Sequence, residues 1–266
     1  MKKVSPLDYT FAVGKIRALE KFLLKEEVFE QALGASLKEA LRLFAESDLH
    51  SDELLHVENS EQLEVILHRE KEQLTRDIRD LMLDKRLLCL VNFDNISDLH
   101  KSCNALSSDF LRNYLMYVID MHNIKSFLRL YILKEPQEKL SEVLACEGFL
   151  KRKDLLTLYS QELMAFINSL EYVYKHYEII DYAYYLGDAI QKTVKEKSFV
   201  ALEKAINDFL MQELLPAKYI TFGPEPIVAH YFARLNEINL IRMIVLAKLN
   251  DAPLDLVKAR LNNVYA

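Results

Sequence analysis

Apolar residues recur at helical spacing along most of this chain, and no segment of useful length alternates with period two. The longest helical pattern runs from Asp109 to Leu133 and is stopped by Pro136. The 266 residues include only five glycines and six prolines, few for a protein rich in strands or loops. Because Leu, Ala, Glu and Lys dominate the composition and favour helices, the sequence predicts an all-α fold.

Other segments share this spacing and have capping or breaking residues near their ends. A turn is expected at Asp94 and Asn95. Helices are expected from Ser5-Pro6 onward, over Glu26 to Leu33, Ser36 to Ala45, Ser60 to Leu83, and Lys192 to Leu214, the last ended by Pro216.

The stretch from 222 to 250 predicts a pair of helices. Pro226 falls in the first turn of the first helix, and Glu225 places a negative charge where exposed N–H groups favour it. Asn236 offers a pause or a cap before a second apolar run. Arg242 interrupts that run, so we expect a partly buried arginine that forms an ion pair holding subdomains together.

Charge and cysteine content exclude several classes of protein. The net charge of −6 and the interspersed lysines and arginines argue against a nucleic-acid binder. Three cysteines without Cys-x-x-Cys spacing suggest neither a disulfide framework nor a zinc site. The longest apolar run, Leu87 to Val91, is too short to span a bilayer. We therefore expect a soluble, cytoplasmic protein without a membrane span, which reaches a membrane only through a protein partner.

Motifs for catalysis and cofactor binding are missing. The chain has no phosphate-binding glycine loop, and five glycines leave little material for one. Glu53 and His56 form one Glu-x-x-His, whereas a helical di-metal site needs two such motifs and two further glutamates. His122 and His230 lie in apolar helices, where a satisfied core or interface role is expected. The sequence predicts no catalytic residue, no metal site and no cofactor.

A weak internal repeat relates three parts of the chain. Residues 123–129 align with 236–242, and residues 11–17 align more loosely with both. Arg17, Arg129 and Arg242 are thereby separated by 112 and 113 residues. We expect one structural unit over 1–266, built of pseudo-repeats with related helices near 11–25, 123–134 and 236–249.

Six tyrosines between 172 and 185 have two interpretations. They either pack in a core with their hydroxyls bonded, which we favour, or form a docking surface, since tyrosines are enriched at interfaces. The tyrosines are Tyr172, Tyr174, Tyr177, Tyr182, Tyr184 and Tyr185.

The two ends of the chain resemble one protein family. The C-terminal part resembles the signature of the C subunit of the V-type (A-type) ATPases, the counterpart of the eukaryotic d subunit. The resemblance lies in Phe222-Gly223-Pro224-Glu225-Pro226, followed by Asn236-Glu237-Ile238 and Ile241-Arg242-Met243-Ile244. Residues 9–20 are similar to the opening helix of that family, which also carries the Arg-x-x-Glu seen here as Arg17 and Glu20. The chain is shorter than the family members.

This resemblance implies a fold and a role. The fold is three similar helical subdomains around a pseudo-threefold axis, shaped like a funnel. The role is that of a non-catalytic central-stalk subunit on the cytoplasmic face of the membrane, coupling the rotor shaft subunits (D and F) to the proteolipid ring for proton or sodium transport. Glu178 and Asp181 resemble a Glu-x-x-Asp of the family and are expected to pair with the arginines of the repeat. The structural or interface candidates are Arg17, Glu20, Arg129, Glu178, Asp181, Glu225, Asn236 and Arg242.

Two other functions stay open at this point. The chain could be a helical-repeat adaptor unrelated to an ATPase, which would bind a short peptide. It could also be an all-α enzyme or a lipid-binding bundle, which would need a closed apolar pocket with a few convergent polar groups.

Overall fold

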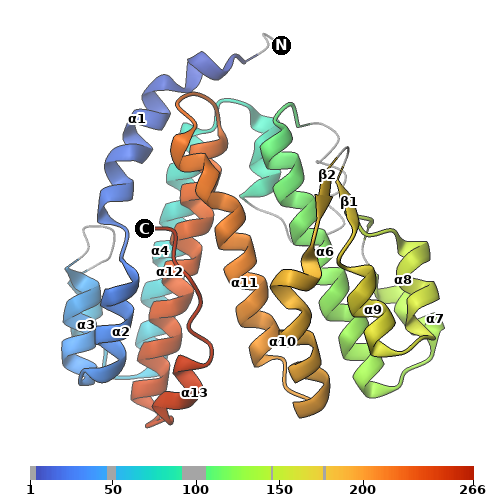
Figure 1. Ribbon diagram of the computed structural model, residues 1–266. Coiled ribbons are helices and arrows are strands. Elements are labelled where there is room, and N and C mark those ends of the chain that lie inside the picture. The colour runs from blue at the N-terminus through green and yellow to red at the C-terminus, as the bar shows by residue number, and fades with distance from the viewer. Residues whose placement is uncertain (1–3, 47–51, 92–105, 145, 176–177) are drawn as a thin grey trace. The chain divides into compact units, whose positions relative to one another are not determined.

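The protein is mostly helical, as a computed structural model shows (Figure 1). The structure describes residues 4–46, 52–91, 106–144, 146–175 and 178–266. The chain divides into two compact units. Unit 1 combines Met1–Asn92 with Met211–Ala266, and unit 2 is Phe93–Leu210.

Unit 1 contains the helices of both ends of the chain. Its elements are η1 (Pro6–Tyr9), α1 (Thr10–Leu19), η2 (Glu20–Phe22), α2 (Glu26–Gly34), α3 (Leu37–Ala45), η3 (Asp52–His56), α4 (Ser60–Leu81), η4 (Lys85–Leu90), η5 (Leu215–Tyr219), α12 (Glu225–Leu249) and α13 (Leu254–Lys258).

Unit 2 contains the middle of the chain. Its elements are α6 (Asp109–Leu133), α7 (Gln137–Val143), α8 (Arg152–Tyr159), α9 (Leu163–Ser169), β1 (Val173–Lys175), β2 (Glu178–Ile180), α10 (Tyr182–Glu196) and α11 (Val200–Leu214), whose last four residues belong to unit 1.

Most predicted helices are confirmed, and the structure shows side-chain caps at several of their starts. Helix α6 covers the predicted range, and the hydroxyl of Ser108 accepts the Leu111 N–H at its start (3.3 Å). Ser36 forms a capping box with Glu39 at the start of α3. The turn expected at Asp94 and Asn95 lies outside the described residues.

Two predicted boundaries are wrong. Residues 192–214 do not form one helix, because Lys197 adopts a left-handed conformation (φ 53°) that ends α10 before α11 begins. Asn236 neither interrupts nor caps α12, which continues to Leu249. The buried residues Ile227, Ile238 and Ile244 lie along the whole length of this helix, so packing favours its continuation through Asn236.

The all-α prediction is wrong in one detail. Strands β1 and β2 form an antiparallel ribbon in which Tyr174 pairs with Ile179 and Val173 pairs with Ile180. Each strand has three residues, too few for a period-two pattern to be recognised. Val173 is buried, whereas Tyr174 and Ile179 are 73% and 55% exposed, so the ribbon presents an open apolar face.

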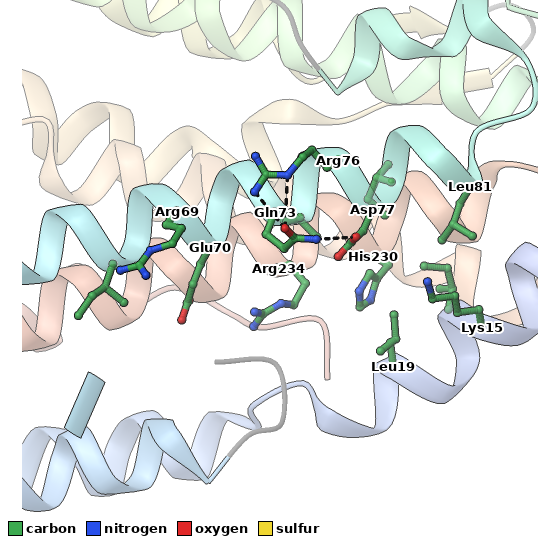
Figure 2. A pocket seen from close by; sticks show the side chains of 14 residues that line it. Lys15, Leu19, Arg69, Glu70, Gln73, Arg76, Asp77, Leu81, His230 and Arg234 are labelled. Carbon is green, nitrogen blue, oxygen red and sulfur yellow. Dashed lines mark hydrogen bonds between the residues drawn. The ribbon is translucent and has the colours of Figure 1, made fainter. Parts of the chain in front are cut away.

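Helix α12 forms the centre of unit 1. It contacts α1, α2, α3, α4, η5 and α13. Ile241, Ile244 and Val245 on α12 belong to the same core as Phe29 and Phe44, from α2 and α3. A groove of about 500 Å³ remains between α1, α4 and α12 (Figure 2).

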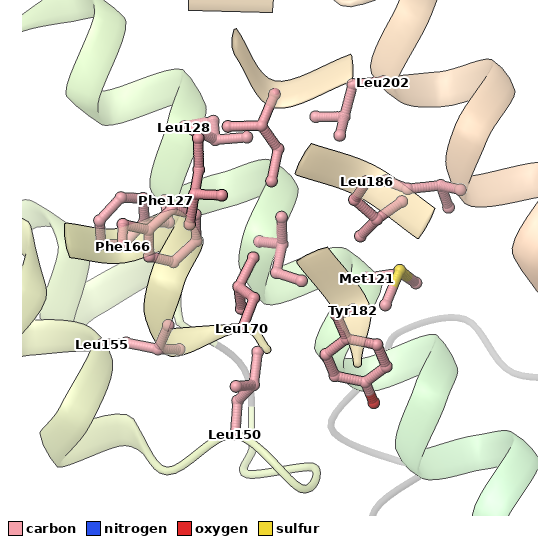
Figure 3. Packing of buried hydrophobic residues seen from close by; sticks show 14 of the residues in the cluster. Met121, Phe127, Leu128, Leu150, Leu155, Phe166, Leu170, Tyr182, Leu186 and Leu202 are labelled. Carbon is pink, nitrogen blue, oxygen red and sulfur yellow. The ribbon is translucent and has the colours of Figure 1, made fainter. Parts of the chain in front are cut away.

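The core of unit 2 is rich in aromatic rings and lies around α6 (Figure 3). Phe127 of α6 stacks on Phe166 of α9 with a distance of 4.0 Å between ring centroids. Tyr182 of α10 is fully buried in the same core and meets Phe209 of α11 edge to face.

The division into two compact units does not test whether the chain contains the predicted subdomains and internal repeat. The three similar subdomains around a pseudo-threefold axis stay a prediction. So does the pseudo-repeat of helices near 11–25, 123–134 and 236–249 in one structural unit.

A buried carboxylate lies in unit 2. Asp120 is fully buried on α6, where it accepts hydrogen bonds from the Tyr182 hydroxyl (2.8 Å), the Phe149 N–H (3.0 Å) and the Leu150 N–H (3.1 Å). Gly148 packs so closely that a Cβ there would lie 2.2 Å from Oδ1 of Asp120. The carboxylate thus holds the segment before α8 against α6. Burial raises the pKa of Asp120 to about 7, although the three hydrogen bonds act to lower it.

This pKa predicts a pH-dependent stability. The folded pKa lies above the value of about 4 in an unfolded chain, so the contribution of Asp120 is complete below pH 4 and is lost as pH rises through 7. The loss should be on the order of 1 kcal/mol per pH unit in that window. Urea denaturation at several pH values should show this slope for the wild type and a smaller slope for Asp120→Asn. Equal slopes would show that Asp120 is charged throughout the window.

Candidate functional site

Five of the eight candidate residues lie in unit 1, where the two ends of the chain meet. They are Arg17, Glu20, Glu225, Asn236 and Arg242. The other three, Arg129, Glu178 and Asp181, lie in unit 2.

Arg17 joins three segments of unit 1. Its Nη1 donates to both carboxylate oxygens of Glu20, at 2.8 and 2.7 Å. Its Nη2 donates to the backbone carbonyls of Ala217 (2.7 Å) and Ile220 (2.9 Å), at the end of η5. The hydroxyl of Tyr265 reaches Glu20 at 3.4 Å, so the C-terminal tail joins the same group of contacts. Burial, followed by the nearby Glu20 carboxylate, raises the pKa of Tyr265.

Asn236 holds the C-terminal tail by its side chain. Its Nδ2 donates to the Asn263 carbonyl (3.0 Å), and its Oδ1 accepts from Nδ2 of Asn262 (2.8 Å). The side chain predicted to cap a helix therefore bonds a segment that follows α13.

The central contact of this region is a buried ion pair that the sequence analysis missed. Arg234 and Glu237 pair within α12, and their side chains are 5% and 4% exposed. The second oxygen of Glu237 accepts the N–H of Leu24 (3.0 Å), just before α2 begins. A buried charge is tolerated only when it is paired and hydrogen-bonded, and this one meets both conditions. The signal was present in the sequence, since Arg234 and Glu237 repeat the Arg-x-x-Glu spacing of Arg17 and Glu20.

Helix α12 holds α2 at both of its ends. Glu237 binds the Leu24 N–H at the beginning, and the Lys248 ammonium group binds the carbonyls of Leu33 (2.9 Å) and Ala35 (2.5 Å) at the end. A cation at the C-terminal end of a helix satisfies carbonyls that have no partner within the helix. These two contacts fix α2 in both position and direction along α12.

Arg242 forms a weaker contact than expected. Its Nε donates to Glu64 of α4 at 2.6 Å, but the two side chains are 51% and 43% exposed. The pair joins two helices of one unit, and pairs this exposed contribute about 0–1 kcal/mol.

Glu225 lies in the first turn of α12, as predicted. Its Oε2 is buried, with no hydrogen-bond partner among the residues that the structure describes, and it approaches Gly223 so closely that a Cβ there would lie 2.2 Å away. Gly223 also has a φ of 116°, so glycine is required at this turn.

Glu178 and Asp181 contact near neighbours in unit 2, and their expected pairing with the arginines of the repeat stays a prediction, since Arg17 and Arg242 belong to unit 1. Glu178 pairs with Lys175 at 3.7 Å, across the β1–β2 ribbon, and Asp181 accepts the Tyr184 N–H (2.9 Å) as the cap of α10. The guanidinium of Arg129 lies over the Phe199 ring at 5.7 Å. Each side chain finds a partner close to it in the chain or on a neighbouring helix of unit 2.

The tyrosines of 172–185 divide between the two interpretations. Tyr182 is fully buried, whereas Tyr172, Tyr174 and Tyr184 are 66%, 73% and 81% exposed. Tyr177 lies outside the described residues. Tyr174 and Ile179 are exposed and pair across the β1–β2 ribbon, and we call the apolar surface they form the ribbon surface.

His230 departs from the expected satisfied core histidine. It is buried on α12, and within the described part of the chain its Nδ1 has no hydrogen-bond partner. Burial, and then the positive charge of Arg234, lowers the pKa of His230 to about 4, so the ring is neutral at physiological pH.

Nothing in the described parts of the chain points to bound metal or to a membrane span. No group of three or more His, Cys, Asp or Glu side chains is placed there to hold a metal ion. Among the same residues, no helix is long and apolar enough to cross a bilayer. The hydrogen bonds from Glu237 and Lys248 of α12 to the backbone at the two ends of α2 hold these two helices together.

The buried and exposed ion pairs of α12 should differ sharply in strength. Glu237→Ala leaves Arg234 buried without its carboxylate, so we expect a loss of about 3–5 kcal/mol of unfolding free energy. Glu64→Ala breaks the exposed pair with Arg242 and should cost less than about 1 kcal/mol. Urea denaturation of both variants measures the difference. A cost for Glu237→Ala as small as that for Glu64→Ala would contradict the central role of the buried pair.

Comparison with known proteins agrees with the resemblance at the two ends. The family model described as ATP synthase (C/AC39) subunit matches residues 93–260. The chain is 25% identical over 147 residues to the C subunit of the V-type sodium ATPase of Enterococcus hirae. That alignment covers 55% of this chain and 42% of the Enterococcus protein, so the chain spans less than half the length of this relative. Because the family model covers more than half of its residues, the chain belongs to the ATP synthase (C/AC39) subunit family, the C subunits of the V-type ATPases.

Proposed function

We propose that this chain is a non-catalytic coupling subunit of the central stalk of a V-type or A-type rotary ATPase. It connects the rotor shaft subunits (D and F type) to the proteolipid ring, on the cytoplasmic face of the membrane. It transmits torque for proton or sodium transport. The family match over residues 93–260 carries this proposal, and it argues against an adaptor unrelated to an ATPase.

A subunit that transmits torque needs stiffness and two separate interfaces. The contacts around α12 favour stiffness, because Arg17, Glu237 and Lys248 bond backbone groups far away in the sequence. Rigid elements joined by buried, satisfied polar contacts resist relative movement better than apolar contacts alone. No step of this function needs a bound nucleotide, and the chain's five glycines offer no phosphate loop.

The ribbon surface is suited to one of the two interfaces. Tyr174 and Ile179 pair across the ribbon, and both are exposed to solvent. Exposed tyrosines with adjacent apolar side chains are typical of protein interfaces.

Binding experiments test the proposal and the surface together. The full chain should bind the purified shaft complex and, separately, the detergent-solubilised ring from the same organism. Replacing Tyr174 and Ile179 by Ala should weaken one of the two by about tenfold or more, since a few large side chains carry much of the binding energy at interfaces.

Tyr219→Ala provides the matched control, because this tyrosine is 87% exposed but lies in unit 1. It should leave both affinities unchanged. Binding of the wild type to neither partner, with the chain shown folded by circular dichroism, would overturn the coupling role. Equal effects of the ribbon variant and Tyr219→Ala would overturn only the assignment of the ribbon surface.

A further inference from the structure

The groove between α1, α4 and α12 extends along α4. Its lining residues on α4 begin at Ile66 and recur every three or four residues to Leu81, so they follow one face of the helix. At 1.5 Å per residue this face is about 22 Å long. Figure 2 shows the side chains arranged along α4, with Arg69 and Leu81 near opposite ends.

The groove has apolar walls and a charged rim. Ile16, Ile66 and Ile78 are buried in its walls, and Leu19 and Leu74 are half-buried. On the rim, Arg69-Glu70 and Arg76-Asp77 repeat the same charge order seven residues apart, with Lys15 contributed by α1. Charges that repeat with this period flank helix–helix seams in coiled coils.

The cations of the rim are available to a partner. Arg69 binds both oxygens of Glu53 (3.0 and 2.7 Å), whereas Arg76 donates to Gln73 (3.0 Å) and lies 3.9 Å from Glu72. These four charged side chains are at least 54% exposed, so a carboxylate from outside can compete with Glu53 and Glu72 for the two arginines.

The floor of the groove contains an unsatisfied polar group. His230 is 2% exposed, lines the groove and has no hydrogen-bond partner for Nδ1 among the described residues. In Figure 2 its ring is directed toward Leu19 and Lys15, and Arg234 extends from the same side of α12. A buried polar atom without a partner is costly, and an occupant of the groove that hydrogen-bonds to it removes that cost.

We propose that this groove binds an amphipathic helix of a partner protein. The apolar stripe of that helix packs against Leu19 and Leu74, and its acidic residues pair with Lys15, Arg69 and Arg76. The occupant reaches the buried His230 with a polar side chain.

Shape and polarity favour a helix over a lipid tail. Charged or amide side chains occur along the whole α4 side of the groove, including Gln73 between Arg69 and Arg76. A hydrocarbon tail would leave these groups facing apolar atoms, whereas a helix can offer a polar side chain at every turn. The groove can bind such a helix whether or not the chain couples rotation.

Fluorescence anisotropy with the full chain tests the proposal. The probe is a designed helical peptide of about 15 residues, matched to the length of the groove, with a leucine stripe flanked by glutamates. A second peptide has lysines in place of the glutamates. The acidic peptide should bind at least about tenfold more tightly than the basic one, and its binding should weaken as salt rises.

Paired variants locate the binding. Lys15→Glu with Arg76→Glu should weaken the acidic peptide by about tenfold, because two attractions become repulsions. Lys21→Glu with Lys71→Glu makes the same change of charge at exposed residues next to α1 and on α4, outside the groove lining, and should have little effect. No binding of the acidic peptide, equal binding of both peptides or equal effects of the two variant pairs would each overturn the proposal. So would saturable binding of a fatty acid that excludes the acidic peptide.

Discussion

The arrangement of unit 1 depends on one buried carboxylate, that of Glu237. Burying this charge is costly, and Arg234 on the same helix together with the Leu24 N–H offsets the cost. Because the amide belongs to the chain just before α2, the carboxylate is satisfied only when the N-terminal helices lie correctly against α12. An apolar contact at this place would tolerate sliding, whereas a buried charge does not.

The two units satisfy their buried carboxylates in different ways. Glu237 has a cation within one turn of its own helix, and its second oxygen accepts a backbone amide. Asp120 instead accepts hydrogen bonds from neutral donors, namely two amides and the Tyr182 hydroxyl. The carboxyl group of Asp120, whose pKa burial raises to about 7, is therefore sensitive to pH near neutrality.

The bounds of a helix were predicted correctly from the sequence where they depend only on residues within or next to that helix. Helix α6 was predicted over its full range because its helical pattern continues until the break at Pro136. Asn236 was assigned to a helix end because asparagine often caps, and only the distant Asn262 and Asn263 explain its presence in mid-helix. The β1–β2 ribbon was missed because three residues cannot show a period.

Among the candidate site residues, too, contacts that are local in sequence were predicted better than those that depend on distant parts of the chain. Arg17 and Glu20 were found because the resemblance pointed to them, and their contact is local in sequence. The pair of Arg234 and Glu237 has the same spacing but was passed over, since burial depends on helices more than 200 residues away in the chain. Glu178 and Asp181 were assigned distant partners, although nearby groups satisfy them. Spacing alone therefore identifies a possible pair but not its environment.

Native-state hydrogen exchange of the Leu24 amide tests the central contact most directly. If Glu237 holds the chain before α2 as described, this amide should exchange only in the global unfolding reaction, together with the core amides of α12. Exchange of Leu24 through a low-energy local opening, while the α12 amides stay protected, would contradict the account.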